Sequence, residues 1–203
     1  MKNILIVLGG GRPKGNTRQL ADAFAQGARD AGHQVEIVSL NQVEVRGCTG
    51  CNACRYGKPC VQKDGFNDLV PKIKAADLLV FASPLLFWTL SSKIKAFIER
   101  FYCLAEKDEN PPCGRYEKYP VKDAALLMTS ADDYFWTYEQ AVSYYLSVCR
   151  HSLYRVSRQG HGAGGRLRGH QWKALHQPDR PPENGLRVWK KSLPMSVFLI
   201  GIK

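Results

Sequence analysis

Apolar and polar positions along this chain follow two different spacings. Strand-like apolar runs occur four times, at residues 4–8, 35–40, 78–82 and 124–128. Segments in which apolar residues recur three or four positions apart lie between and after these runs, at residues 17–28, 66–76, 94–101 and 141–148. The first spacing is typical of buried strands and the second of amphipathic helices. Four alternations of strand and helix predict a doubly wound α/β fold with right-handed crossovers, a parallel sheet between two helical layers.

In such a sheet, ligands bind beyond the carboxyl ends of the strands. The first loop at that edge, G-G-G-R-P-K-G-N-T at residues 9–17, joins a strand to a helix N-terminus, where backbone N–H groups and the dipole favour a phosphate. Arg12 and Lys14 add positive charge, and Asn16 and Thr17 add donors. The loop has neither a P-loop Gly-Lys-Ser/Thr nor G-x-G-x-x-G. The alternative is a glycine-rich turn in which Asn16 or Thr17 caps the helix.

Two further loops follow the third and fourth strands. The segment S-P-L-L-F-W-T-L-S-S at residues 83–92 contains Phe87 and Trp88, which can form a wall for a flat aromatic ring or belong to the core. In the third loop, Thr129 to Thr137, Asp132 and Asp133 precede a helix and are interpreted as N-cap residues. One phosphate site and one flat apolar wall suit a mononucleotide such as FMN. Because FMN would carry the chemistry, we assign no catalytic side chain.

Four of the seven cysteines lie in one short segment, G-C-T-G-C-N-A-C-R-Y-G-K-P-C. They are Cys48, Cys51, Cys54 and Cys60, with the spacing C-x2-C-x2-C-x5-C. One loop can therefore offer four thiolates, the ligand set of an iron–sulfur cluster. The alternative is a loop of free thiols, and zinc sites more often use two separated C-x2-C pairs.

Composition narrows the class of protein. The 203 residues, 44% of them hydrophobic, fit one folded domain rather than a disordered chain. The opening apolar run, residues 4–8, is too short for a signal peptide or a membrane span. We therefore expect a cytoplasmic protein, in which clustered thiols favour metal or redox chemistry over disulfides. The net charge of +11 is concentrated at the end, because residues 150–203 hold 11 of the 29 Lys and Arg but 2 of the 18 Asp and Glu.

These motifs resemble those of the flavodoxin-like NAD(P)H-dependent FMN reductases, and within them the iron–sulfur flavoproteins. The resemblance covers about residues 1–148. The first loop is similar to the family's G-S-P-R-x-x-G-N-T, and P-L-L-F-W-T is similar to its P-V-Y-F-G-S flavin loop. The segment K-I-K-A-F-I-E-R, Lys93 to Arg100, matches the helix that follows. The cysteine segment sits where the iron–sulfur flavoproteins carry their cluster motif.

The resemblance implies a function and a set of site residues. It implies an NAD(P)H oxidoreductase that passes electrons through FMN to a quinone, a free flavin or another small acceptor, often as a homodimer. The residues implied in FMN binding are Gly10, Arg12, Lys14, Gly15, Asn16, Thr17, Pro84, Leu85, Leu86, Phe87 and Trp88. An electron carrier whose four clustered cysteines hold a [4Fe-4S] centre is the alternative. Gly10 replaces the usual Ser and Leu86 the usual Tyr, which predicts FMN binding weaker by about one to two decades.

Residues 150–203 depart from this pattern, so we divide the chain into an FMN-binding domain, residues 1–149, and a basic Gly/Arg/His-rich tail. No apolar run longer than two residues occurs between 150 and 193, where a fifth strand is expected. Three explanations compete: a basic arm that binds nucleic acid or a partner, a divergent lid, and translation in the wrong frame. In a shifted frame, Arg155 to Lys191 can encode a strand, a glycine loop and a helix. Without a fifth strand, we expect an irregular tail and an exposed edge on the fourth strand.

Overall fold

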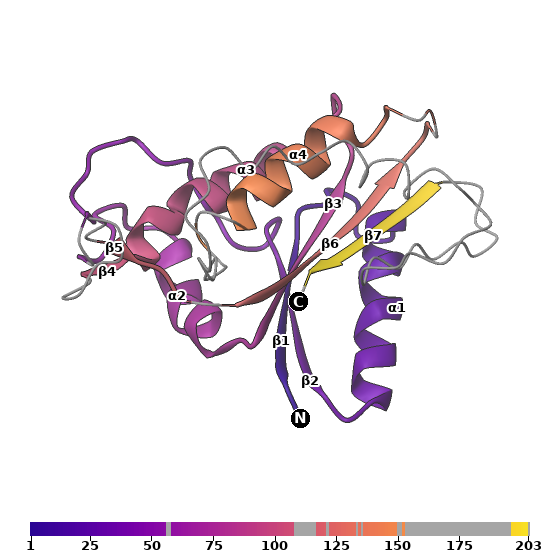
Figure 1. The fold of residues 1–203 in the computed structure, drawn as a ribbon, viewed down its shortest axis with the longest axis horizontal. Helices are drawn as coiled ribbons and strands as arrows, with labels where there is room; N and C mark the ends of the chain where they lie inside the picture. The colour runs from indigo at the N-terminus through magenta and orange to yellow at the C-terminus, as the bar shows by residue number, and fades with distance from the viewer. Residues whose placement is uncertain are drawn as a thin grey trace, which may run out of the picture.

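The computed structural model describes residues 1–55, 58–107, 117–120, 122–132, 134, 136–149, 152 and 196–202. Its main sheet has five strands in the order β2-β1-β3-β6-β7 (Figure 1). They are β1 (Asn3–Leu8), β2 (Gln34–Ser39), β3 (Leu78–Pro84), β6 (Asp123–Ser130) and β7 (Ser196–Ile202). The first four pair in parallel, in the strand order of a flavodoxin-like sheet.

Helices cover both faces of this sheet (Figure 1). They are α1 (Asn16–Asp30), α2 (Phe66–Ala75), α3 (Ser92–Glu99) and α4 (Glu139–Val148). Ile4 and Ile6 of β1 pack with α1 in one core, whereas Leu5 and Val7 belong to the core beneath the other three helices. Successive strand side chains point to opposite faces, so every central strand contributes to both cores. The predicted three-layer α/β/α architecture is confirmed.

The short elements beyond α3 were not predicted. The chain leaves α3 through a 3₁₀ turn, η1 (Arg100–Leu104), so the α-helix expected to reach residue 101 ends earlier. A two-residue antiparallel ladder follows, between β4 (Glu106–Lys107) and β5 (Glu117–Lys118). None of the helices that the structure describes combines the length and the apolar character needed to cross a bilayer.

The fifth strand corrects one expectation from the sequence. β7 lies beside β6 and runs antiparallel to it, with Ser196 opposite Ser130 and Ile202 opposite Ala124. The edge of β6 is therefore covered along its length, and the prediction that it lacks a neighbour is wrong. The apolar run S-V-F-L-I-G-I supplies the strand, but it comes after the interval where a fifth strand was sought. Most of the basic tail, residues 153–195, lies outside the described residues. The segment considered in a shifted frame, Arg155 to Lys191, lies within that interval.

Candidate functional site

The loops that follow β1, β3 and β6 are bonded to one another at the carboxyl edge of the sheet. The N–H of Gly9 donates to the carbonyl of Ala82 at 2.8 Å, and the N–H of Leu85 donates to the carbonyl of Thr129 at 2.8 Å. The buried hydroxyls of Thr17 and Thr129 lie 2.8 Å apart. These contacts bring the three loops selected from the sequence into one place.

The first loop is fixed from behind by close packing and by an amide. A Cβ at Gly9 would lie 2.3 Å from Cγ1 of Ile94 and 2.5 Å from Oγ of Ser91, so only glycine fits against the start of α3. The carbonyl of Gly10 accepts a hydrogen bond from Nδ2 of Asn41, at the end of β2. Lys93 in turn donates to Oδ1 of Asn41 at 2.6 Å. Asn41 was missed from the sequence, because no local motif marks it.

The start of α1 has the features of an anion site. Its N-cap is Gly15, which has no side chain to cap the helix, and the first turn contains no acidic residue. The positive end of the helix dipole is therefore not offset by a carboxylate there. Space in front of the loop is open, because a Cβ at Gly11 would meet nothing within 4 Å. Asn16 and Thr17 lie inside the helix, so the prediction that one of them is its N-cap is wrong.

The second loop is a tight turn that holds aromatic side chains in solvent. Leu86 and Thr89 exchange two backbone hydrogen bonds, of 3.0 and 3.2 Å. Between them Phe87 and Trp88 have φ values of 49° and 58°, in the left-handed region. Phe87 is 91% exposed and Trp88 42% exposed. The alternative in which these rings belong to the core is therefore wrong, and they stand at the edge where a planar ligand would lie.

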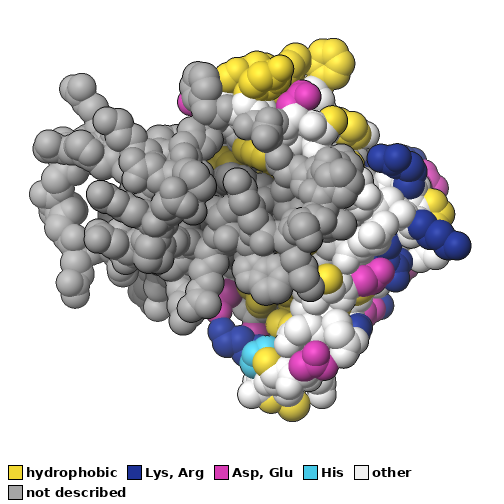
Figure 2. Space-filling model, turned by 90° about the vertical axis from the view of Figure 1, so that its right-hand side faces the viewer, with side chains coloured by type: hydrophobic (Ala, Val, Ile, Leu, Met, Phe, Trp, Pro, Cys, Tyr) yellow, Lys and Arg dark blue, Asp and Glu magenta, His cyan; other side chains and the backbone are white. Residues whose placement is uncertain are grey.

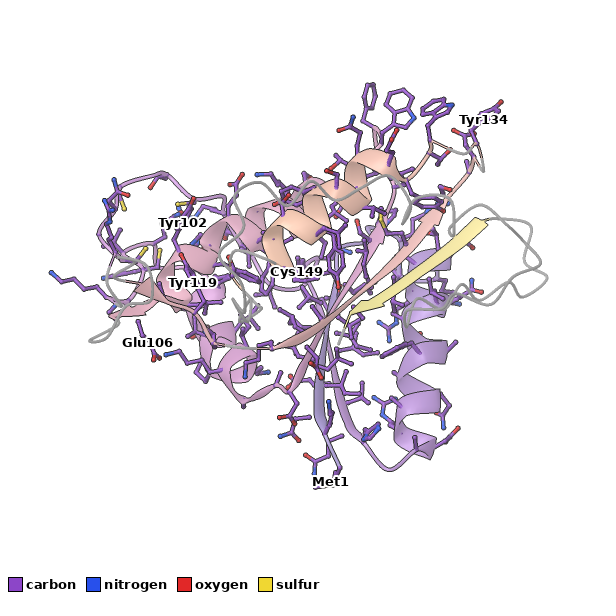
Figure 3. The ribbon with its side chains drawn as sticks, in the orientation of Figure 1. Met1, Tyr102, Glu106, Tyr119, Tyr134 and Cys149 are labelled. Carbon is purple, nitrogen blue, oxygen red and sulfur yellow. The ribbon has the colours of Figure 1, made fainter. Side chains whose placement is uncertain are left out.

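Two further rings extend this aromatic surface, and they come from the third loop. Trp136 packs against Trp88 with a ring separation of 5.7 Å, and Tyr134 stacks on Trp136 at 5.8 Å with ring planes 4° apart. Figure 3 shows Tyr134 and neighbouring rings at the tip of the molecule above α4. Neither ring was predicted to belong to the site, because the sequence pattern of this loop draws attention to its aspartates. α4 begins at Glu139 with Tyr138 at the cap position, so Asp132 is not its N-cap, and Asp133 lies outside the described residues.

The cysteine segment lies between β2 and α2 and packs at the other end of α3. The N–H of Cys48 donates to Oε2 of Glu99 at 3.2 Å, and Sγ of Cys60 accepts from Nη2 of Arg100 at 3.2 Å. In Figure 3 the sulfur atoms of this region lie on the side of Tyr102, across the view from Tyr134. The cysteine segment therefore lies at the end of α3, whereas the Pro84–Trp88 loop precedes its start.

The four clustered thiols differ in exposure and do not form a metal site in this arrangement. Cys51 is exposed, Cys54 is buried, and Cys48 and Cys60 are intermediate. Burial raises the pKa of Cys54, and the charge interaction with the neighbouring Cys60 raises it further. Among the residues that the structure describes, no three His, Cys, Asp or Glu side chains come together as metal ligands. These side-chain positions do not fit the predicted [4Fe-4S] centre.

A buried ion pair anchors this segment to α3 and η1. Nη1 of Arg100 lies 2.6 Å from Oδ2 of Asp64, and both side chains are almost fully buried. Asp64 also accepts from the N–H of Arg46 at 2.9 Å and from the N–H of Phe66 at 3.2 Å. Burial on its own would raise the pKa of Asp64, but these donors outweigh it and the pKa is lowered. The pair supports the fold and lies away from the phosphate loop.

Comparisons with known proteins agree with this geometry. The model of the family described as NADPH-dependent FMN reductase matches residues 2–134. An iron-sulfur flavoprotein of Archaeoglobus fulgidus is 31% identical over 94 residues, which is 46% of this chain and 43% of that protein. A Bacillus subtilis protein, whose name proposes an NAD(P)H-dependent FMN-containing oxidoreductase, is 30% identical over 130 residues, which is 64% of this chain and 67% of that one.

A solved structure supports the fold assignment. The NAD(P)H:quinone oxidoreductase from Methanothermobacter marburgensis superposes with a TM-score of 0.55 and 19% identity, over 71% of this chain and 75% of that one. At this identity the likeness concerns the fold. The chain spans about half the length of the curated iron-sulfur flavoproteins that it matches.

Proposed function

Because the chain belongs to the NADPH-dependent FMN reductase family, we propose that it binds FMN and uses it to pass electrons from NAD(P)H to a small acceptor. The acceptor would be a quinone, a free flavin or a related molecule. The observation that carries the proposal is the loop between β1 and α1. Contacts at Gly9 and Gly10 fix its backbone, and it leads into a helix whose N-cap residue, Gly15, has no side chain to cap it.

The FMN phosphate would lie at the start of α1. Arg12 and Lys14 are exposed there and supply positive charge. The backbone of Gly10, Gly15 and Asn16 would line the phosphate. Thr17 is buried, and its hydroxyl can donate to a phosphate oxygen while it accepts from Thr129. The loop thus combines charge, dipole and hydroxyl donors for a dianion.

The flavin ring would lie along the Pro84–Trp88 segment. Leu85 is tied to β6 through its N–H, and Leu86 belongs to the closed turn, so the segment has a fixed backbone. When bound, FMN supplies the ability to take a hydride from NAD(P)H and to release two electrons to an acceptor. For a quinone, the balance is NAD(P)H and one proton from solvent giving NAD(P)⁺ and the hydroquinone. The chain's own residues bind and orient the reactants.

An iron–sulfur flavoprotein is the second candidate function, favoured by the names of the first relatives. The described side chains do not fit a cluster, so no electron-transfer step through one belongs to this proposal.

The tail that would carry nucleic-acid or partner binding lies mostly outside the described residues. A cytoplasmic location and a homodimer remain part of the proposal for the reductase.

The test is an FMN titration of the protein freed of flavin. The Asn16→Ala/Thr17→Ala variant should bind FMN at least about tenfold more weakly, because hydrogen bonds to a charged phosphate are lost. Thr129→Val is the matched control, since it breaks the same hydroxyl contact but keeps the hydroxyl of Thr17. Equal affinity in the double variant and the control, with both folded by circular dichroism, would contradict the phosphate assignment.

A further inference from the structure

The turn at Phe87 and Trp88 combines two unfavourable features that do not help the chain to fold. A two-residue turn with positive φ at both central positions normally has Asn-Gly, because other side chains are strained there. Here both positions carry bulky aromatic rings, and Phe87 stands almost wholly in solvent. Strain and exposed apolar area concentrated at one turn are typical of a binding surface.

Beside this turn lies a pocket that the FMN-binding residues alone do not explain. Its volume is about 760 Å³, within the range of small-molecule sites. Phe87, Trp88 and Thr89 form one side, and the opposite side comes from the third loop and α4. That second side comprises Trp136, Glu139, Gln140 and Tyr144. Figure 2 shows hydrophobic side chains gathered at the top of the molecule, which in Figure 3 is where Tyr134 lies.

The lining has a defined chemistry. The rings of Phe87, Trp88 and Trp136 form a continuous aromatic row, with separations of 5.6 and 5.7 Å between neighbours. Among the described residues that line the pocket, Glu139 alone carries a charge. Aromatic faces and a carboxylate both attract cations, and planar aromatic cations above all.

The groups around Tyr144 do not reverse this preference. Burial, followed by the charge of Glu99, raises the pKa of Tyr144 to about 12, so this side chain adds no charge to the pocket. The ammonium of Lys95 lies 5.5 Å from the centre of that ring, but it is paired with Glu99 at 2.6 Å. The local positive charge is therefore offset, and Glu139 remains the charged residue among the described pocket lining.

We propose that this pocket binds the electron acceptor and selects a planar aromatic molecule that carries a positive charge. The inference rests on the proposed function and names the substrate class of that site. For a planar dye cation such as methylene blue, one NAD(P)H gives one NAD(P)⁺ and one neutral reduced dye. The two electrons and the proton transferred from the nicotinamide balance this reaction, and no further oxidant is needed.

The test uses equilibrium dialysis of the full chain, loaded with FMN, against methylene blue without NAD(P)H. Glu139→Gln should weaken binding of methylene blue by about three- to tenfold, because an ionic partner next to aromatic faces is lost. Binding of anthraquinone-2-sulfonate, a planar anion, should stay within about twofold or improve. Glu36→Gln is the control, because it removes the same charge from an exposed residue of β2 on another part of the surface.

Each outcome decides a different point. Equal dye affinity in Glu139→Gln and Glu36→Gln would overturn the charge selection. If Trp136→Ala converts a dimer into a monomer in sedimentation and leaves dye binding unchanged, the aromatic row is a contact between two copies. That result would overturn the assignment of the pocket to the acceptor. If FMN does not bind, the reductase proposal fails and the acceptor role with it. Tight FMN binding without dye binding would overturn the pocket alone.

Discussion

Replacing Arg100 by Met should destabilise the protein far more than loss of an exposed charge. The guanidinium lies 2.6 Å from Asp64, donates to the carbonyl of Arg46 at 3.0 Å and lies 4.9 Å from the ring centre of Phe66. Met fills most of the volume but leaves the carboxylate of Asp64 buried without its main counter-charge. Breaking a buried pair in this way costs about 3–5 kcal/mol. Because two backbone N–H groups still donate to Asp64, we expect a value near the lower limit, about 3 kcal/mol.

Urea unfolding followed by circular dichroism measures this loss. With a slope of about 2 kcal/mol per molar urea, the midpoint should fall by about 1.5 M at an unchanged slope. Arg18→Met is the control, since Arg18 pairs with Asp22 on the exposed face of α1 and should cost less than about 1 kcal/mol. Adding Asp64→Asn to Arg100→Met should restore part of the midpoint, because the unpaired charge is gone. A midpoint for Arg100→Met close to that of the control would refute the reasoning.

Two further changes test the loop packing and the acid response. Gly9→Ala should lower the free energy of unfolding by about 1–3 kcal/mol, because the new carbon would overlap Ile94. Gly11→Ala is the control, because its new carbon enters open space and should change the free energy of unfolding little. Similar thermal midpoints for the two variants would contradict this packing. Since the pKa of Asp64 is lowered by folding, its contribution to stability is full above the unfolded pKa and is lost as the pH falls through the folded one. The urea concentration at the unfolding midpoint should therefore decrease as the pH is lowered below about 4, and it should decrease less in Asp64→Asn. Parallel pH profiles of the two proteins would argue against this role of Asp64.

The sequence pattern predicted the alternating strands and helices. It did not predict the helix caps and turns, whose conformation depends on backbone angles and on contacts between residues distant in the sequence. Hydrophobic spacing reports burial, so the four parallel strands and the four helices were found from it. Helix caps depend on backbone angles that composition does not reveal, and the cap of α1 proved to be Gly15. The turn at Phe87 and Trp88 has none of the residues that mark its type, so its conformation could not be predicted.

The candidate site was predicted in part for the same reason. Loops at the carboxyl ends of strands follow from topology, and these loops do meet. Asn41 reaches them from the end of β2 and carries no motif, whereas Trp136 lies in the third loop itself, where the sequence drew attention to the aspartates. Cysteine spacing shows that four thiols share a loop, but whether they converge depends on side-chain directions that spacing does not determine.

The reversed direction of β7 has a practical consequence for handling the protein. Ile202 pairs with Ala124, so β7 ends at the amino edge of the sheet, opposite the loops that follow β1, β3 and β6. In an all-parallel sheet, a final strand would instead end at the edge that holds those loops. A linker to an electrode or a bead attached after Ile202 would therefore leave the loops facing solution, where dissolved reactants can reach them.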